Sequence, residues 1–265
     1  MFNSIFSKTL HEKRWMMLGW GLGVFAMSLL MMGFYHSFSD GNFDELVKSL
    51  PDSMKSLIGD LAALKTVPGY VSQQVYAFRI PLLTIIMSTI LYSGLLAGDE
   101  GDGQLQVLLT KPVSRSRVVL EKYFAGLVVC LVVCFGSVPG VLLGLTIIKE
   151  SMSFWMLAQA ALGCWLVTVA FGSVAYGLGA ISGKRGQAGS IAGVVVFVSY
   201  LITSFVTSVS GIEQIEKLSL FHYYNKPSIA EFGLELADIL LFLGVMTICI
   251  FVGMVVFSKR DIHAK

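Results

Sequence analysis

Six long apolar stretches alternate with polar segments along the chain. Each is close to twenty residues or longer, the length of an α-helix that crosses the hydrocarbon core of a bilayer. They cover residues 15–35, 80–97, 123–147, 154–181, 188–209 and 236–257. These runs lack the alternation of apolar and polar residues that marks the strands of a membrane barrel. We therefore predict an all-α integral membrane protein, with residues 1–265 forming a single transmembrane domain.

Two local features refine this pattern. The first fourteen residues place apolar side chains at helical spacing among polar ones, which predicts a short helix over residues 1–14 in the membrane interface. Pro139 lies inside the third stretch and has no backbone N–H to donate, so it predicts a kink there.

Composition agrees with this class and excludes a soluble domain. The chain is 55% hydrophobic and 14% charged, whereas soluble domains carry about a quarter charged residues. The four cysteines all lie inside apolar stretches, so we expect no disulfide framework.

Lysine and arginine gather in three polar segments that a six-span topology places on one side. They are Lys8, Lys13 and Arg14, then Lys184 and Arg185, then Lys259, Arg260 and Lys265. Positive residues favour the cytoplasmic side, so we predict that both termini are cytoplasmic. Residues 37–74 and 210–235 are acidic on balance and are predicted to be external.

The segment of residues 99–117 is more charged and more patterned than a connector requires. It contains three leucines at helical spacing, namely Leu105, Leu108 and Leu109. Pro112 then ends this short helix, and Ser114 can cap a second helix that starts near Arg115. We predict a helix–break–helix elbow at the cytoplasmic surface. From the residues alone, a solvated loop whose cations lie on anionic lipid is the other interpretation.

Several kinds of chemistry are absent from the sequence. The middles of the predicted spans contain no Asp, Glu, His or Lys, which argues against ion-coupled carriers and intramembrane enzymes. The stretch "GLGAISGKRG" lacks the glycine spacing and the Ser or Thr of a phosphate loop. We expect no catalytic residues, no metal site, no cofactor bound by this chain and no nucleic-acid partner.

The stretch "DEGDGQLQVLLTKPVSRSRVVLEKYFAG" resembles the signature of type-2 ABC exporter permeases. That signature has an acidic cluster, Gly-Thr-Leu-Glu, a Leu-Leu pair, Pro-Val-Ser-Arg and a lysine at the start of the third span. The matching residues are Glu100, Gly103, Leu105, Leu108, Leu109, Pro112, Val113, Ser114, Arg115 and Lys122. Gln104 and Gln106 replace the threonine and the second glutamate. The likeness extends to "LSLFHYY" and "FSKRDI" near the C-terminus.

The resemblance implies that the elbow is a coupling helix that inserts into a groove of a separate ABC ATPase subunit. The docking residues it implies are Glu100, Gly103, Leu105, Leu108, Leu109, Lys111, Pro112, Val113, Ser114 and Arg115. It implies an exporter in a bacterial-type inner cell membrane, built from two permeases, expected to be identical, and two ATPase subunits that hold ATP and magnesium. The chain itself would then not be an enzyme. A membrane scaffold or sensor that binds an ATPase-like partner without transport is the alternative.

Two polar stripes are candidates for a substrate pathway. Their members lie four residues apart, at Thr84, Ser88 and Tyr92 and at Ser199, Thr203 and Thr207. Such hydroxyls either bond to their own or a neighbouring helix, or line a route. The resemblance places the route between the second and fifth helices of two permeases. A path without charges suits hydrophobic or amphipathic cargo, such as drugs, antimicrobial peptides or lipid-like molecules.

Overall fold

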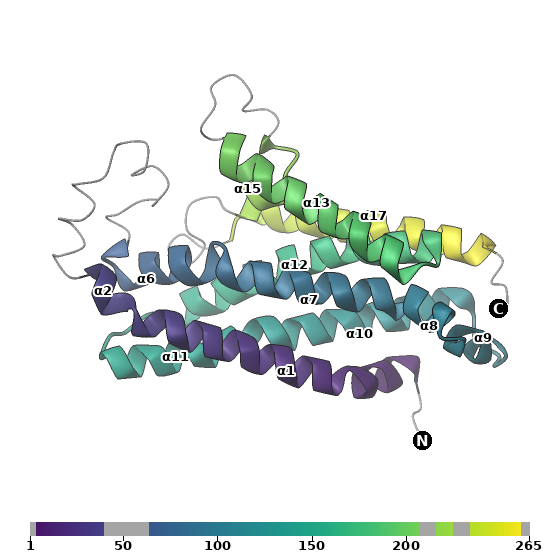
Figure 1. The fold of residues 1–265 in the computed structure, drawn as a ribbon, viewed down its shortest axis with the longest axis horizontal. Helices are drawn as coiled ribbons and strands as arrows, with labels where there is room; N and C mark the ends of the chain where they lie inside the picture. Colours follow the sequence, from purple (N-terminus) through teal and green to yellow (C-terminus); the bar gives the residue numbers. More distant parts are fainter. Residues whose placement is uncertain (1–3, 40–63, 207–215, 225–233, 261–265) are drawn as a thin grey trace.

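The computed structural model describes residues 4–39, 64–206, 216–224 and 234–260, which form a bundle of long helices (Figure 1). All regular structure within these residues is helical. Six helical segments are long and apolar enough to cross a membrane: Ile5–Ser37, Val67–Leu95, Arg115–Ile148, Phe154–Ser182, Arg185–Ser204 and Leu236–Lys259. The predicted class, all-α with six candidate spans, is confirmed.

The first span is a single helix, α1 (Ile5–Gly33), followed by the short α2 (Tyr35–Ser39). Ser4 caps α1, since its hydroxyl accepts a hydrogen bond from the Ser7 N–H at 3.1 Å. The structure has no break near residue 14, where we expected a separate helix to end. The reason is local, because neither glycine nor proline interrupts the chain before Gly19. The position of these first turns in the membrane interface stays a prediction.

The second span begins earlier than we predicted. The short helix α6 (Val67–Tyr70) and the π-helix η1 (Val71–Tyr76) precede α7 (Arg79–Leu95). Residues 67–74 were predicted to belong to an external segment, yet most of them are buried against the bundle. Their apolar and aromatic side chains explain this, because they gain more from burial than from water. Residues 40–63 of that segment lie outside the described part of the chain.

The third span is interrupted close to the position of the predicted kink. It consists of α10 (Arg115–Phe135) and α11 (Ser137–Ile148), which meet at Gly136. Pro139 follows three residues later and cannot donate to the carbonyl of Phe135. The Gly136 N–H is shared between the carbonyls of Val132 and Val133, at 3.0 and 3.1 Å. The missing donor therefore separates the two helices without ending the span.

Helix α12 (Phe154–Ser182) lies at the centre, packed against α7, α10, α13 (Arg185–Val206) and α17 (Leu236–Lys259). In its most apolar window, 61% of the residues are buried, against 17% in α13 and in α17. A helix that is hydrophobic on all sides suits such a central position. The two outer helices instead expose large apolar side chains, as expected where lipid surrounds the protein.

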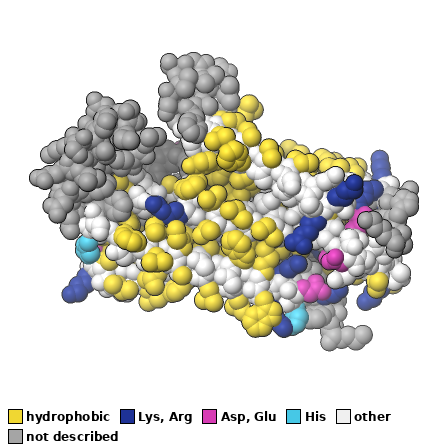
Figure 2. Space-filling model, viewed as in Figure 1, with side chains coloured by type: hydrophobic (Ala, Val, Ile, Leu, Met, Phe, Trp, Pro, Cys, Tyr) yellow, Lys and Arg dark blue, Asp and Glu magenta, His cyan; other side chains and the backbone are white. Residues whose placement is uncertain are grey.

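The two ends of the bundle differ in character (Figure 1). One end holds the start of α1, the short helices α8 (Ala97–Gly101) and α9 (Gln104–Leu109), and the end of α17. The other holds α2, α6 and α15 (Leu220–Tyr224). Figure 2 shows that most visible Lys and Arg side chains gather at the end with α8 and α9. The predicted topology places these Lys and Arg residues on one side of the membrane, the cytoplasmic side, and their position at one end of the bundle fits this prediction.

Helix α15 is anchored to the outer part of the second span. The Tyr224 hydroxyl donates to the carbonyl of Tyr76 at 2.6 Å. Burial raises the pKa of the Tyr224 hydroxyl well above its ordinary value, so this donor stays protonated. The predicted external segment of residues 210–235 is therefore partly folded onto the bundle.

Candidate functional site

The segment of residues 99–117 has the helix–break–helix geometry that the sequence predicts. After α8, Gly103 takes a left-handed conformation with φ of +74° and starts α9. A Cβ at Gly103 would meet no atom within 4 Å, so only the backbone conformation favours glycine there. Residues 111–114 are not helical, and the Ser114 hydroxyl then accepts from the Arg117 N–H at 3.3 Å to cap α10. The role of this elbow in coupling stays a prediction.

The leucine face of α9 is turned largely toward the bundle. Leu105 is fully buried, and Leu108, Leu109 and Val113 are partly buried against the same core. An amphipathic helix on a protein surface packs its apolar face against its own chain, and the docking role of these residues stays a prediction. Val107, which the pattern did not single out, is 67% exposed on the outer face. Lys111, Pro112 and Ser114 are also exposed, and Gly103 is partly so.

A groove of about 320 Å³ runs along the outer face of α9 beside the start of α1. It is lined by Lys8, Asp102, Gly103, Gln104, Val107, Leu108 and Lys111. The first turns of α1 are held nearby, because the Glu121 carboxylate on α10 accepts from the Phe6 N–H at 3.0 Å. The lining combines apolar side chains with charged ones. The sequence could not suggest Lys8 as a member, because it lies far from α9 along the chain.

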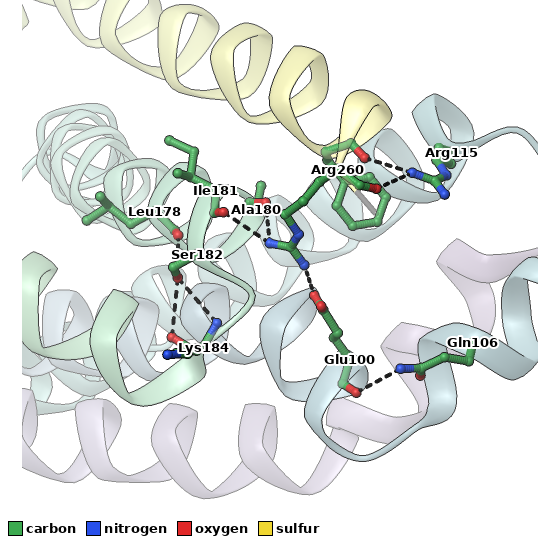
Figure 3. Close-up of polar contacts among 10 residues, drawn as sticks. Glu100, Gln106, Arg115, Leu178, Ala180, Ile181, Ser182, Lys184 and Arg260 are labelled. Atoms are coloured by element: carbon green, nitrogen blue, oxygen red, sulfur yellow. Dashed lines mark hydrogen bonds and ion pairs between the residues drawn. The ribbon is translucent and has the colours of Figure 1, made fainter. Parts of the chain in front are cut away.

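Arg260, just after α17, joins three helices (Figure 3). One guanidinium nitrogen, Nη1, donates to the carbonyls of Ala180 and Ile181 at 2.8 and 3.2 Å. These carbonyls belong to the last turn of α12, where helix carbonyls lack partners and the helix dipole favours a cation. The other nitrogen, Nη2, forms an ion pair with the Glu100 carboxylate on α8.

Gly183 makes room for this guanidinium. Its φ is +63°, and a Cβ there would lie 2.5 Å from Nη2 of Arg260. The left-handed backbone that ends α12 favours glycine here, and a Cβ would also displace the end of the Arg260 side chain. Sequence reasoning noted the "FSKRDI" stretch but assigned no role to Arg260.

Arg115, at the start of α10, connects the other side of the elbow to the end of α17 (Figure 3). Its Nη1 donates to the carbonyls of Phe257, Ser258 and Arg260, at 3.3, 3.3 and 2.6 Å. Glu100 and Arg115, both expected to dock a partner, are thus engaged within the chain. We refer to the contacts of Glu100, Arg115 and Arg260 as the elbow clamp.

Lys122 adds a buried ion pair at the base of the elbow. The residue is only 4% exposed, its Nζ donates to the carbonyl of Leu95 at 2.7 Å, and it pairs with Asp99. A buried ammonium is costly unless it is paired and hydrogen-bonded, and both conditions hold here. The acidic pair that opens the elbow is therefore divided, with Asp99 bound to Lys122 and Glu100 bound to Arg260.

The polar stripe on α7 is turned into the bundle. Thr84, Ser88 and Tyr92 are all fully buried. The Thr84 and Thr168 hydroxyls lie 2.7 Å apart, and the Ser88 hydroxyl donates to the Thr168 carbonyl on α12, also at 2.7 Å. The Tyr92 hydroxyl donates to the carbonyl of Tyr123 on α10 at 3.5 Å. This is the helix-packing arrangement that was one of the two interpretations of the stripe.

The stripe on α13 faces a different neighbour. The Thr203 hydroxyl donates to the Ser219 hydroxyl at 2.7 Å, and that hydroxyl donates to the Ser199 carbonyl, also at 2.7 Å. The Thr203 side chain and the Ser199 carbonyl therefore face the segment just before α15. Thr207 lies outside the described residues. The structure does not bring the described members of the two stripes together.

A different face of α7 forms a groove with α13 and α15, of about 440 Å³. Its lining includes Phe78, Ile86, Thr89, Ile90, Phe197 and Tyr200. The Phe78 and Tyr200 rings are 4.8 Å apart at this site. Thr89 is only 8% exposed, and its hydroxyl has no hydrogen-bond partner in the described part of the chain. Sequence reasoning missed the groove because these residues have the pattern of a lipid-facing surface.

Comparisons with known proteins show the family of the chain. The family model for the ABC-2 family transporter protein matches residues 4–262. The chain is also similar to the probable ABC transporter permease protein NosY of Stutzerimonas stutzeri, with 28% identity over 153 residues. That match covers 56% of this chain and 49% of the relative, so it spans about half of the relative's length.

Proposed function

Because the chain belongs to the ABC-2 family of transporter proteins, we propose that it is the permease of an exporter, driven by a separate ATPase subunit. Membership of this family supports a role as the membrane subunit of an ABC transporter, with ATP hydrolysis on a separate chain. The finer proposal is that two identical permeases and two ATPase subunits move cargo outward across a bacterial-type inner membrane. ATP and magnesium would bind in the ATPase, and both permease termini would face the cytoplasm.

The observation that carries this proposal is the elbow clamp. Nucleotide hydrolysis in the cytosol can move membrane helices only if a stiff connection joins the two. Arg260 links α8 to the end of α12, and Arg115 links the start of α10 to the end of α17. A displacement of the elbow would therefore be transmitted directly to these spans.

We propose that the ATPase docks on the outer face of α9 rather than on its leucine face. Val107 supplies exposed apolar area. Lys8, which also pairs with Glu12, and Lys111 supply positive charge beside it, against the single carboxylate of Asp102. A partner surface with an apolar side chain flanked by carboxylates would complement this groove. The first turns of α1 would then take part in docking.

We propose that cargo moves along the groove between α7 and α13. Its lining is aromatic and aliphatic, and no charged residue lines it. Hydrophobic or amphipathic cargo fits this composition. The inward-facing hydroxyls of Thr84, Ser88 and Tyr92 would hold α7 to its neighbours instead of contacting cargo.

The test is co-purification of the full chain with its ATPase, followed by transport in reconstituted vesicles. Val107→Asp should reduce co-purification strongly, because it places a carboxylate in the docking groove. Lys184→Ala is the control, since it alters the charge by the same amount at an exposed position of the same end. Unchanged co-purification of Val107→Asp would contradict the docking surface. A stable complex that moves no cargo would favour the scaffold alternative.

A further inference from the structure

Arg185, the first residue of α13, differs from the other arginines that lie against the elbow end. It is exposed and makes no hydrogen bond or ion pair within the described part of the chain, whereas Arg115 and Arg260 are both engaged. Its side chain nevertheless lies against the bundle. A Cβ at Gly94 would be 3.4 Å from its Nε, and a Cβ at Gly98 would be 3.7 Å from its Cδ. The guanidinium is thus positioned beside α7 and α8 without being neutralised.

The α7–α13 groove lies on the same line of contact, farther from the elbow. Thr89 and Gly94 are separated by five residues of α7, or about 7.5 Å of helix rise. Gly193 of the groove lies eight residues beyond Arg185 on α13, or about 12 Å. Arg185 therefore lies on the elbow side of the groove, about two turns of α13 before Gly193, while Thr89 is one of the residues that line the groove.

The unpaired Thr89 hydroxyl points to a ligand. A threonine in a helix ordinarily bonds the carbonyl of the preceding turn. Here the buried hydroxyl has no partner in the described part of the chain, and leaving such a group unsatisfied is unfavourable. A hydrogen-bonding group on a molecule in the groove would remove this cost.

We propose that the groove binds an amphiphile with an anionic head, a carbonyl-containing link and an apolar tail. The Arg185 guanidinium would bind the phosphate or carboxylate head, whose geometry it matches with two parallel hydrogen bonds. The Thr89 hydroxyl would donate to the carbonyl of an ester or amide link. The tail would lie among Ile86, Phe78 and Phe197. This rests on the proposed function, since the groove is the proposed export route, and it names the substrate class.

Probe binding to the full chain alone, in nanodiscs of neutral phosphatidylcholine, tests the proposal without the ATPase. Three photoactivatable probes share one tail: an acyl glycerol phosphate, an alkyl glycerol phosphate and an uncharged monoacylglycerol. Saturation of crosslinking gives the affinity, and peptide mapping gives the location. We expect both phosphate probes to bind tighter than the monoacylglycerol and to crosslink to α7 and α13.

Variants of Arg185 and Thr89 test recognition of the anionic head and of the carbonyl link separately. Arg185→Ala should weaken both phosphate probes by about tenfold, and Arg185→Lys should restore part of this. Lys184→Ala, beside it and equally exposed, should have no effect. Thr89→Val removes only the hydroxyl and should weaken the acyl probe by about fivefold, while the ether-linked alkyl probe is unaffected. Unchanged thermal unfolding of each variant establishes that it is folded.

Each contrary outcome overturns the proposal. These outcomes are equal binding of the uncharged probe, equal effects of Arg185→Ala and Lys184→Ala, and binding of tail-free glycerol phosphate at the same affinity. Crosslinks that avoid α7 and α13, as a second permease copy filling the groove would cause, also count against it.

If the probes bind as expected but nothing is exported, the proposed function fails alone. If other cargo is exported but the phosphate probes do not bind, only this proposal fails.

Discussion

Helix α7 presents two faces that both carry hydroxyl groups, and their surroundings differ. On the inner face, Thr84 and Ser88 are hydrogen-bonded to α12. On the groove face, Thr89 is almost as deeply buried, yet its hydroxyl has no partner among the described residues. A satisfied buried hydroxyl indicates packing between helices, whereas an unsatisfied one indicates a missing partner. The comparison therefore assigns rigidity to one face and ligand contact to the other.

The same division continues into the neighbouring helices. The inner face belongs to a unit of α7, α10, α12 and α17, joined at the elbow end by the elbow clamp. The groove face meets α13, whose described residues take no part in the elbow clamp. Motion during transport is therefore expected between α13 and the rest of the bundle.

The strongest test of this contrast compares two glycines. A Cβ at Gly172 on α12 would lie 2.3 Å from the Ser88 hydroxyl and 2.4 Å from the Tyr92 ring, whereas one at Gly193 would meet no atom within 4 Å. Gly172→Leu should abolish folding or cost roughly 3 kcal/mol or more, because the tight contact cannot relax. Gly193→Leu should leave thermal unfolding nearly unchanged. Equal behaviour of the two variants would remove the distinction between the faces.

Filling the groove should stop transport without disturbing the rest of the protein. Gly193→Trp places a large side chain between α7 and α13, and we expect transport in vesicles to fall at least about tenfold. Co-purification of the ATPase and its basal hydrolysis should persist. Val255→Trp, at an exposed apolar position on α17, is the matched control. Normal transport by Gly193→Trp would place the route elsewhere.

Weakening the elbow clamp should separate hydrolysis from transport. Arg260→Ala removes the contacts to both Glu100 and α12, so we expect transport to fall several-fold while the ATPase stays bound and active. Arg260→Lys keeps the charge but cannot reach both partners in the same way, and should recover only part of transport. The adjacent Lys259→Ala serves as control. Parallel losses of transport and hydrolysis in Arg260→Ala would argue against a transmitting role.

The smallest effect is expected on the inner face of α7. Thr84→Val removes one buried hydroxyl from its pair with Thr168 and should cost about 1 kcal/mol of stability. Transport per folded molecule should be unchanged, measured against Thr84→Ser, which keeps the hydroxyl. A specific loss of transport with normal stability would return Thr84 to the pathway.

The sequence by itself determined the class, the six candidate spans, the break at Pro139 and the helix–break–helix elbow. These features depend on local properties: the length of apolar runs, the missing donor of proline and the capping hydroxyl of Ser114. A signature stretch of contiguous residues was also enough to suggest the family.

Only the tertiary structure decided which way each helix faces. Periodicity shows that Leu105, Leu108 and Leu109 share a side, and that Thr84 and Ser88 do, but not whether that side meets the bundle, lipid or a partner. In a membrane the surrounding lipid is as apolar as the core, so hydrophobicity does not separate the two. The elbow clamp joins Glu100, Arg115 and Arg260, which are distant in the chain. The same is true of Arg185 and Gly94, which meet between α13 and α7. Helix packing alone determines such meetings, and for that reason the clamp and the groove emerged only from the structure.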